Sequence, residues 1–192
     1  MSPRSAKQLS EIRENSRSNI LDSAFELFAK QGFHSTSITQ IATKAGVAKG
    51  LIYNYFEKKE DLMYAIIYRG LTQTEAFMED IMNASPGKAR IRVMLDIAFR
   101  MLVQEYDYQK LMTSIGLQLS QFPDLEEIVT AKHKSMTPIL AQELTASGHT
   151  APLKHARLLS AALDGIAIQY LVVPDATPLE QFKQDLIDEY CT

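Results

Sequence analysis

The chain has 192 residues, of which 46% are hydrophobic, and its 20 basic and 23 acidic side chains give a net charge of −3. This is the composition of a globular protein, and it excludes a uniformly basic nucleic-acid-binding protein of the histone kind. No run approaches the roughly 20 apolar residues of a membrane span, the N-terminus lacks a signal-peptide core, and the single cysteine, Cys191, cannot form an intramolecular disulfide. We therefore expect a soluble cytoplasmic protein with no membrane partner.

The first predicted element is a helix from about residue 11 to residue 31. Gly32 follows it at a point where a helix can end. Apolar residues recur along its second half at helical spacing: Ile20, Ala24, Leu27 and Phe28. These residues are predicted to form an apolar face on which the following helices pack.

Two short helices with a tight turn between them are predicted next. Ser37 and Gln40 have the spacing of a capping box at the start of the first, and Gly46 stands where a left-handed residue would end it. The second begins near Val47 or Ala48. This order is typical of the helix-turn-helix of DNA-binding proteins, although an ordinary helical hairpin has the same pattern.

The residues of this stretch resemble those of a known family, the tetracycline-repressor (TetR) family of bacterial transcription regulators. The resemblance covers roughly the first third of the chain, and several fixed spacings agree at once. The matching residues are Gly32-Phe33, Thr36-Ser37, Ile41-Ala42, Ala45-Gly46-Val47, Tyr53-Asn54-Tyr55-Phe56, Lys59 and Leu62.

The resemblance implies roles for particular residues of the motif. The second short helix would enter the major groove of double-stranded DNA, and the residues nearest the base edges would be Lys49, Gly50, Leu51 and Asn54. The positions that usually grip phosphates in the family are matched by Thr36, Ser37, Tyr53, Tyr55 and Lys59, and Thr39 is a further candidate contact. Hydroxyls and lysines suit phosphates, while an amide or an ammonium can read bases.

The sequence departs from the family pattern at three positions. Ala48 and Leu51 stand where hydroxyl residues are common, and Lys58 stands where a serine often caps the next helix. We expect each change to weaken local capping by about 1 kcal/mol. Leu51 also indicates contact with a thymine methyl group, so no operator sequence is carried over from the family.

A long helix is predicted from about Glu57 to Ala84, with Glu60 and Asp61 in its first turn, where negative charge complements the helix dipole. Ser85-Pro86 marks a restart. Further apolar repeats predict five more helices, which end near Asp107, at Phe122-Pro123, at Gly148, at Pro174 and near the last residues. The third of these is expected to have a kink or a break near Pro138. The last is expected to begin with a capping box at Thr177.

The predicted fold class is all-α with about nine helices, because no run alternates with the period of a strand. A helix-turn-helix DNA-binding domain over residues 1–63 is joined by the long fourth helix to a helical ligand-binding and dimerisation domain over residues 64–192. The first part has 9 basic and 7 acidic residues and the second 11 and 16, net charges of +2 and −5. The positive part is the one that would meet phosphates.

Methionines are concentrated in the larger domain, where seven of eight lie between Met63 and Met136. Thioethers and aromatic rings suit a pocket for a small hydrophobic or amphipathic ligand, and they suit an ordinary core equally well. The family usually houses an inducer pocket among the corresponding helices. The candidate ligand residues are Phe77, Met78, Met94, Phe99, Met101, Met112, Ile115, Phe122 and Met136.

One helix-turn-helix makes few base contacts, so specific binding normally needs two, related by a twofold axis, on a palindromic operator. The resemblance implies a homodimer with a four-helix interface made by the last two long helices. The candidate interface residues are Leu159, Ala162, Leu163, Ile166, Tyr170, Phe182 and Leu186. The same residues would equally fill the core of a monomer.

The sequence carries no enzyme motif such as a glycine-rich phosphate loop or a nucleophile elbow. The histidines lack the spacing of a metal site, and no cofactor is expected. The function predicted is that of a transcriptional regulator, a repressor that leaves its operator when a ligand binds. Two alternatives stay open: a DNA-binding protein of this fold without a small-molecule inducer, acting in chromosome organisation or under a protein partner, and a helical ligand or interaction module without DNA affinity.

Overall fold

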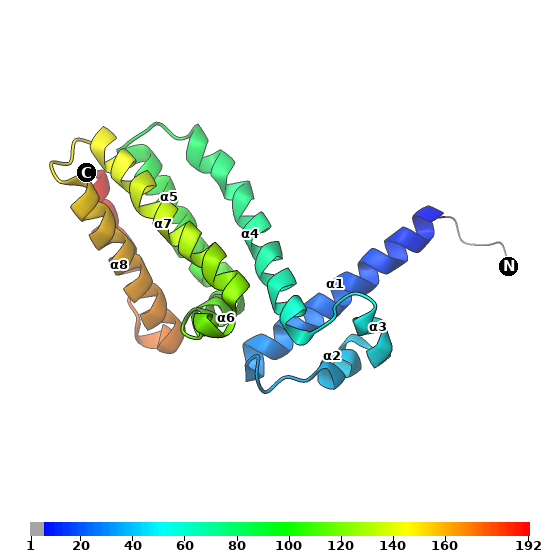
Figure 1. Ribbon diagram of the computed structural model, residues 1–192. Coiled ribbons are helices and arrows are strands. Elements are labelled where there is room, and N and C mark those ends of the chain that lie inside the picture. The colour runs from blue at the N-terminus through cyan, green and yellow to red at the C-terminus, as the bar shows by residue number, and fades with distance from the viewer. Residues whose placement is uncertain (1–5) are drawn as a thin grey trace. The chain divides into compact units, whose positions relative to one another are not determined.

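The computed structural model describes residues 6–192, apart from the side chains of residues 6, 71, 73–76, 132 and 133. Within this range the chain forms nine α-helices, two short 3-10 helices and no strand (Figure 1). The all-α prediction is confirmed. The helices are α1 Ala6–Gln31, α2 Ile38–Ala45, α3 Lys49–Tyr53, α4 Lys59–Asn83, α5 Lys88–Gln104, α6 Tyr106–Gly116, η1 Leu119–Gln121, α7 Pro123–Ala146, α8 Pro152–Val172, η2 Pro174–Ala176 and α9 Leu179–Cys191.

The chain divides into two compact units, Met1–Leu71 and Thr72–Thr192, called unit 1 and unit 2 below. The division falls inside α4, which continues without interruption from one unit into the other. The predicted boundary after Met63 lies earlier in the same helix. Ile66 and Ile67, both buried, still belong to unit 1, so its packing continues further along α4 than the motif alone indicates.

Unit 1 is built around the apolar face that the sequence predicts for α1. Ile20 and Phe28 of this face are fully buried, as are Ile41 of α2, Ile52 of α3 and Leu62 of α4. Helices α2 and α3 are too short to be stable alone, so burial of one apolar side against a longer neighbour is what holds them.

Unit 2 is a bundle in which α7 packs against α8 and α5, and α9 packs against α5 and α8. Its core draws two buried residues from each of these four helices. The core residues are Ile91, Leu95, Leu140, Leu144, Ala156, Leu159, Ile187 and Tyr190.

Two helix starts differ from the sequence prediction. Helix α5 begins at Lys88 with Gly87 as its N-cap, not at Ser85-Pro86. Thr177 does not cap α9, because its hydroxyl donates back to the carbonyl of Val173 at 2.9 Å. Helix α7 also continues through Pro138 without a break.

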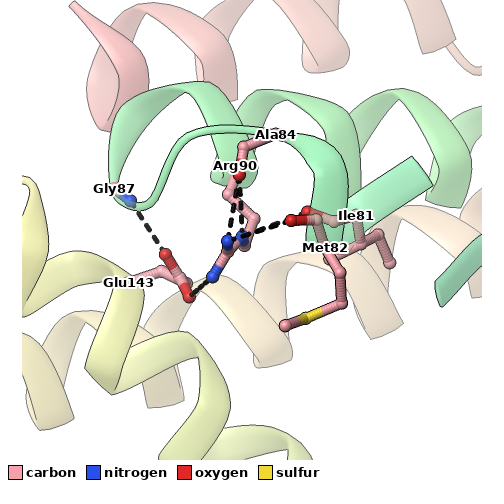
Figure 2. Close-up of polar contacts among 6 residues, drawn as sticks. All are labelled: Ile81, Met82, Ala84, Gly87, Arg90 and Glu143. Atoms are coloured by element: carbon pink, nitrogen blue, oxygen red, sulfur yellow. Dashed lines mark hydrogen bonds and ion pairs between the residues drawn. The ribbon is translucent and has the colours of Figure 1, made fainter. Parts of the chain in front are cut away.

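Gly87 occupies a position that glycine alone suits. Its φ is +86°, and a Cβ built there would lie 3.2 Å from backbone atoms of Ala146 and Ser147 at the end of α7. Its N–H donates to Glu143 of the same helix (Figure 2). The turn before α5 is therefore in tight contact with α7.

Replacing Gly87 with alanine is expected to lower the free energy of unfolding by about 1 to 3 kcal/mol, because the side chain meets both an unfavourable φ and fixed backbone. Urea denaturation at one protein concentration measures the change. Gly116→Ala is the matched control, since nothing lies within 4 Å of its added Cβ and its φ is not in the left-handed range. Equal stability of the two variants would contradict the expectation.

Candidate nucleic-acid interface

The start and end of α2 are formed as its sequence predicts. The N–H of Gln40 donates to Ser37 Oγ at 3.2 Å, and the N–H of Ser37 donates to Gln40 Oε1 at 2.7 Å, which completes the capping box. Gly46 follows with φ +67°, and its N–H donates to the carbonyl of Thr43. This left-handed residue turns the chain sharply into α3.

Helix α3 has five residues, and its N-cap, Ala48, makes no side-chain hydrogen bond. Buried Ile52 fixes the inner side of α3 in the core of unit 1. The outer side carries Lys49, Gly50 and Tyr53, and Asn54 follows at its end; all four are exposed. This side presents an ammonium, an amide and a phenol on a short rigid element.

The other predicted DNA-contacting residues surround α3 to different degrees. Ser37 and Thr39, at the start of α2, are exposed, and Leu51 and Tyr55 are half-buried. The guanidinium of Arg13 from α1 stacks on the ring of Tyr55 at 5.7 Å from its centroid. These residues join the outer side of α3 in one candidate surface.

Thr36 does not join that surface. Its side chain is 2% exposed, its hydroxyl donates to the carbonyl of Gly32 at 2.8 Å, and it accepts a hydrogen bond from Gln31 at 3.1 Å. The hydroxyl therefore holds the turn between α1 and α2, and it faces away from solvent.

Thr36→Val is expected to lower the free energy of unfolding by about 1 to 2 kcal/mol, since the carbonyl of Gly32 and the amide of Gln31 lose a partner while the shape is kept. DNA affinity below the unfolding transition is expected to stay unchanged. Calorimetry and DNA titration measure the two quantities, and Thr145→Val, at an exposed position of α7 outside the candidate surface, is the control. A loss of DNA affinity without a loss of stability would show that the Thr36 hydroxyl does reach DNA.

Lys59, the first residue of α4, also has partners within unit 1. Its ammonium donates to the carbonyls of Phe33 at 2.8 Å and Thr36 at 2.9 Å, and it lies 4.2 Å from the centroid of the Phe33 ring. Desolvation lowers the pKa of this ammonium, and the carboxylate of Glu60 opposes that shift. Through these hydrogen bonds Lys59 joins the turn before α2 to the start of α4.

Asp61 replaces the cap that the sequence lacks at Lys58. Its carboxylate accepts the N–H groups of Glu57 at 2.9 Å and Lys58 at 3.0 Å. The expected weakening at this helix start is therefore offset. The signal was present in the sequence, since an acidic residue at the third helical position can reach back to the N-cap.

Arg13 and Arg17 of α1 are cations that the motif alone does not place. Arg17 stacks on the ring of Phe56 at 5.4 Å, one residue along from the Arg13–Tyr55 pair. The two arginines lie one helical turn apart, which puts them on one side of α1. The four-residue spacing of the two arginines could have been read from the sequence as a shared helix face. Only the folded structure shows that the face meets the rings of Tyr55 and Phe56.

The candidate ligand residues differ widely in how far they are buried in the single chain. Met78 and Met136 are exposed, Ile115 and Phe122 are buried, and Met94 packs against the core of unit 2. Phe77, Met101 and Met112 are half-buried. Phe99 lines a hollow of about 180 Å³, whose walls are Ala98, Phe99, Leu102, Gln109, Leu163, Asp164, Ile166 and Ala167.

The candidate dimer residues mostly pack within their own chain. Leu159 is fully buried and Ile166 is buried, Leu163 and Leu186 pack against the core of unit 2, and the ring of Tyr170 meets that of Tyr106 at 5.8 Å. Ala162 and Phe182 are half-buried. Leu159 and Ile166 thus belong to the core of the single chain, while the other five candidates keep part of their surface open to solvent.

A neighbouring side of α8 is apolar and open to solvent. Ile168 is 47% exposed and Val172 71%, and Leu158 is exposed as well. With exposed Ala161 and half-buried Gly165 they recur at alternate spacings of three and four residues, the pattern of helices that pack along their length. This set, Leu158, Ala161, Gly165, Ile168 and Val172, is called the α8 stripe below.

The described residues contain neither a metal-binding cluster nor a membrane-spanning helix. No group of three or more histidine, cysteine or acidic side chains in that part of the chain is placed to hold a metal ion. No helix in the same range is both long and apolar enough to cross a membrane.

Two family models match the chain. One, described as "Bacterial regulatory proteins, tetR family", matches residues 20–66. The other, described as "Tetracyclin repressor-like, C-terminal domain", matches residues 88–190. The two matches together include α2, α3 and most of the bundle of unit 2.

Individual proteins are similar as well. The fatty acid metabolism regulator protein of Bacillus subtilis (strain 168) is 29% identical over 136 residues, 70% of this chain and 69% of that protein. A regulator from Saccharomonospora viridis, solved with choline, has a TM-score of 0.80 at 19% identity, over 93% of this chain and 95% of that one. AibR, solved with isovaleryl coenzyme A and operator DNA, has a TM-score of 0.71 at 18% identity, over 91% and 97%. At these identities the structural likeness shows the fold.

Proposed function

Because this chain belongs to the tetR family of bacterial regulatory proteins, which regulate transcription and are not enzymes, we propose that it is a ligand-responsive repressor. It binds a palindromic operator as a homodimer, and it leaves the operator when a small hydrophobic or amphipathic molecule binds unit 2. A dimer bound at a promoter obstructs polymerase, which is why release by a ligand would switch transcription on.

The observation that carries the proposal is the outer side of α3. It is exposed along its length, while Ile52 anchors the inner side in the core. A helix-turn-helix needs this arrangement, because the recognition helix must enter the major groove without loss of the packing that positions it. The positive net charge of the first part of the chain has the sign that phosphates require.

Roles on this surface follow from exposure and chemistry. Lys49, Gly50, Leu51 and Asn54 face the bases, where the amide of Asn54 can make a bidentate contact with adenine. The phosphate contacts are assigned to Ser37, Thr39, Tyr53, Tyr55 and Arg13. Thr36 and Lys59 are not assigned a DNA contact. Their polar groups hold the turn that precedes α2, and they thereby position the residues that do contact DNA.

The homodimer forms along the α8 stripe, with α9 beside it. Small residues at Ala161 and Gly165 let two helices approach closely, and Leu158, Ile168 and Val172 supply apolar area that is open to solvent in the single chain. A twofold axis along this stripe gives two copies of α3, as a palindrome requires.

The ligand binds where α5, α6 and α8 enclose the hollow beside Phe99. Its walls are mainly apolar, with the carboxylate of Asp164 and the amide of Gln109 as polar groups, which suits a small amphipathic molecule. Two similar structures hold choline and isovaleryl coenzyme A, and the Bacillus subtilis relative is named for fatty acid metabolism. The hollow of about 180 Å³ fits a group of choline or short acyl size, not a long chain.

The test is a selection of bound duplexes from a random DNA pool, followed by titration of the recovered sequence with the full chain. A palindrome with two equal half-sites is expected. Choline, isovaleryl coenzyme A and octanoyl coenzyme A are then added singly, and at least one is expected to raise the melting temperature and release DNA. No sequence enrichment would leave the alternative of an interaction module without DNA affinity. A map of the bound sites on chromosomal DNA that shows many dispersed sites instead of a few promoters would favour chromosome organisation.

Two single substitutions separate base contacts from phosphate contacts. Asn54→Ala is expected to cost about 1 to 3 kcal/mol on the selected operator and little on random DNA. Tyr53→Phe, which removes one exposed hydroxyl, is expected to cost about 1 kcal/mol on both. Fluorescence anisotropy with the two duplexes measures these values, and the same pattern for both variants would refute the assigned roles.

A further inference from the structure

A buried polar cluster in unit 2 holds the carboxyl end of α4, and neither the DNA-binding surface nor the hollow uses it (Figure 2). Glu143 of α7 is 4% exposed, and the side chain of Arg90 in α5 is 13% exposed. Arg90 Nη1 donates to Glu143 Oε1 at 2.8 Å, and the N–H of Gly87 donates to Glu143 Oε2, also at 2.8 Å. This group of contacts is called the Arg90–Glu143 clasp below.

The remaining nitrogens of Arg90 bind the last carbonyls of α4. Nε donates to Ile81 at 3.0 Å, and Nη2 donates to Ala84 at 2.9 Å and Met82 at 3.3 Å. The last carbonyls of a helix have no partner within it, and the negative end of the helix dipole favours a cation. One planar guanidinium therefore closes the end of α4 and, through Glu143, joins it to α7.

Apolar side chains at this end of α4 are half-buried or exposed, and Phe77 and Ile81 are the half-buried ones among its large apolar residues. Met82 is 60% exposed and Met78 is exposed as well, although Arg100 of α5 stacks on the ring of Phe77 at 5.2 Å. The opposite end of α4 is different, because Leu62 is fully buried in unit 1. Among the described side chains, Arg90 therefore gives the end of α4 a polar support beside its partly buried apolar contacts.

The chemistry of the clasp suits a role in positioning the end of α4 better than a role in holding α5 and α7 together. Burying two charges costs desolvation, and apolar side chains of similar volume often hold two helices together equally well. An apolar pair cannot, however, donate hydrogen bonds to the carbonyls of α4. An arginine can donate these hydrogen bonds, and its planar guanidinium reaches several acceptors at once.

We propose that the Arg90–Glu143 clasp fixes the carboxyl end of α4 and thereby the spacing between operator half-sites that the homodimer accepts. Helix α4 runs unbroken from Lys59 in unit 1 to Asn83 in unit 2. A helix held at both ends has fewer accessible directions than one held at a single end. Arg90 and Glu143 are thus positioning residues that act through α4. The inference rests on the proposed function, since half-site spacing has meaning only for a dimer on a palindrome.

The test uses the full chain and the palindrome recovered by the selection, with versions that carry one or two base pairs more or fewer at the centre. The variants are Arg90→Met and the double variant Arg90→Met with Glu143→Met. Lys183→Met is the matched control, because it removes another ion pair of unit 2, Lys183–Asp96 at 2.7 Å, which does not involve α4. A duplex with a single half-site reports on the recognition surface alone.

For the wild type and Lys183→Met, each change in spacing is expected to weaken binding by about tenfold or more, as a mismatched base pair does. For the two clasp variants the loss is expected to shrink to about threefold or less on the same scale, with unchanged affinity for the single half-site. The double variant matters most, because its apolar pair restores packing without restoring the donors to α4.

A double variant that is as stable as the wild type and equally strict about spacing would overturn the proposal and leave the clasp a structural pair. The same conclusion would follow if Lys183→Met relaxed the spacing as much as the clasp variants do. Failure of the proposed function is a separate result, since it would appear earlier, as a wild-type chain that recovers no palindrome from the pool.

Discussion

Replacing Ile168 with arginine is expected to convert the homodimer to monomers and to weaken binding to the palindrome by at least about a hundredfold. The side chain lies in the middle of the α8 stripe and is 47% exposed in the single chain, so a charge there does not disturb the fold of the monomer. In a dimer the same charge would face apolar residues of the other copy without a partner, and a buried unpaired charge costs several kcal/mol. Loss of the second helix-turn-helix then removes half of the base contacts.

Analytical ultracentrifugation at micromolar concentration measures the oligomeric state, and anisotropy measures DNA affinity. Val129→Arg is the matched control, because Val129 of α7 is 41% exposed but lies outside the α8 stripe. The control is expected to remain dimeric and to bind the palindrome normally. Ile168→Arg that stays dimeric would remove the α8 stripe from the proposal.

Glu143→Ala is expected to lower the free energy of unfolding by about 3 to 5 kcal/mol, since it leaves the buried guanidinium of Arg90 without its counterion. The N–H of Gly87 loses its acceptor as well. This is a large fraction of the stability of a typical domain, about 5 to 15 kcal/mol, so the variant is expected to unfold at a clearly lower urea concentration.

The control for this prediction is again Lys183→Met, whose ion pair with Asp96 is more exposed, at 26% and 47% for the two side chains. Its loss is expected to cost less than about 1 kcal/mol. Arg90→Met with Glu143→Met is expected to recover most of the stability that Glu143→Ala loses. A cost for Glu143→Ala below that of the control would show that the clasp is solvated in solution.

Features that depend on neighbouring residues were predictable from the sequence. The capping box of Ser37 and Gln40 and the left-handed Gly46 use contacts within a few residues, so the pattern specifies the geometry. The apolar spacing of α1 likewise identified Ile20 and Phe28 as core. These local signals were enough for the all-α class and for the helix-turn-helix.

Features that depend on distant parts of the chain were not predictable. Leu158 and Leu159 are adjacent and chemically identical, yet one is exposed and the other is fully buried, because only the packing of α8 on α7 and α9 decides which side faces inward. The same applies to Arg90 and Glu143, which are far apart in the sequence and meet only in the folded bundle. A threonine or a lysine in a binding motif gives no sign of whether it points outward or inward.

Lys59 and Thr36 bear on how relatives of this chain should be sorted. Both match the family motif, yet their polar groups are bonded to carbonyls of unit 1. A descendant that had lost its operator would still need them in order to fold, so a motif score that counts them would rate it as a DNA binder. The exposed residues Lys49, Tyr53 and Asn54 are not held in this way. In a relative that no longer binds an operator, substitutions are therefore expected first at these three positions.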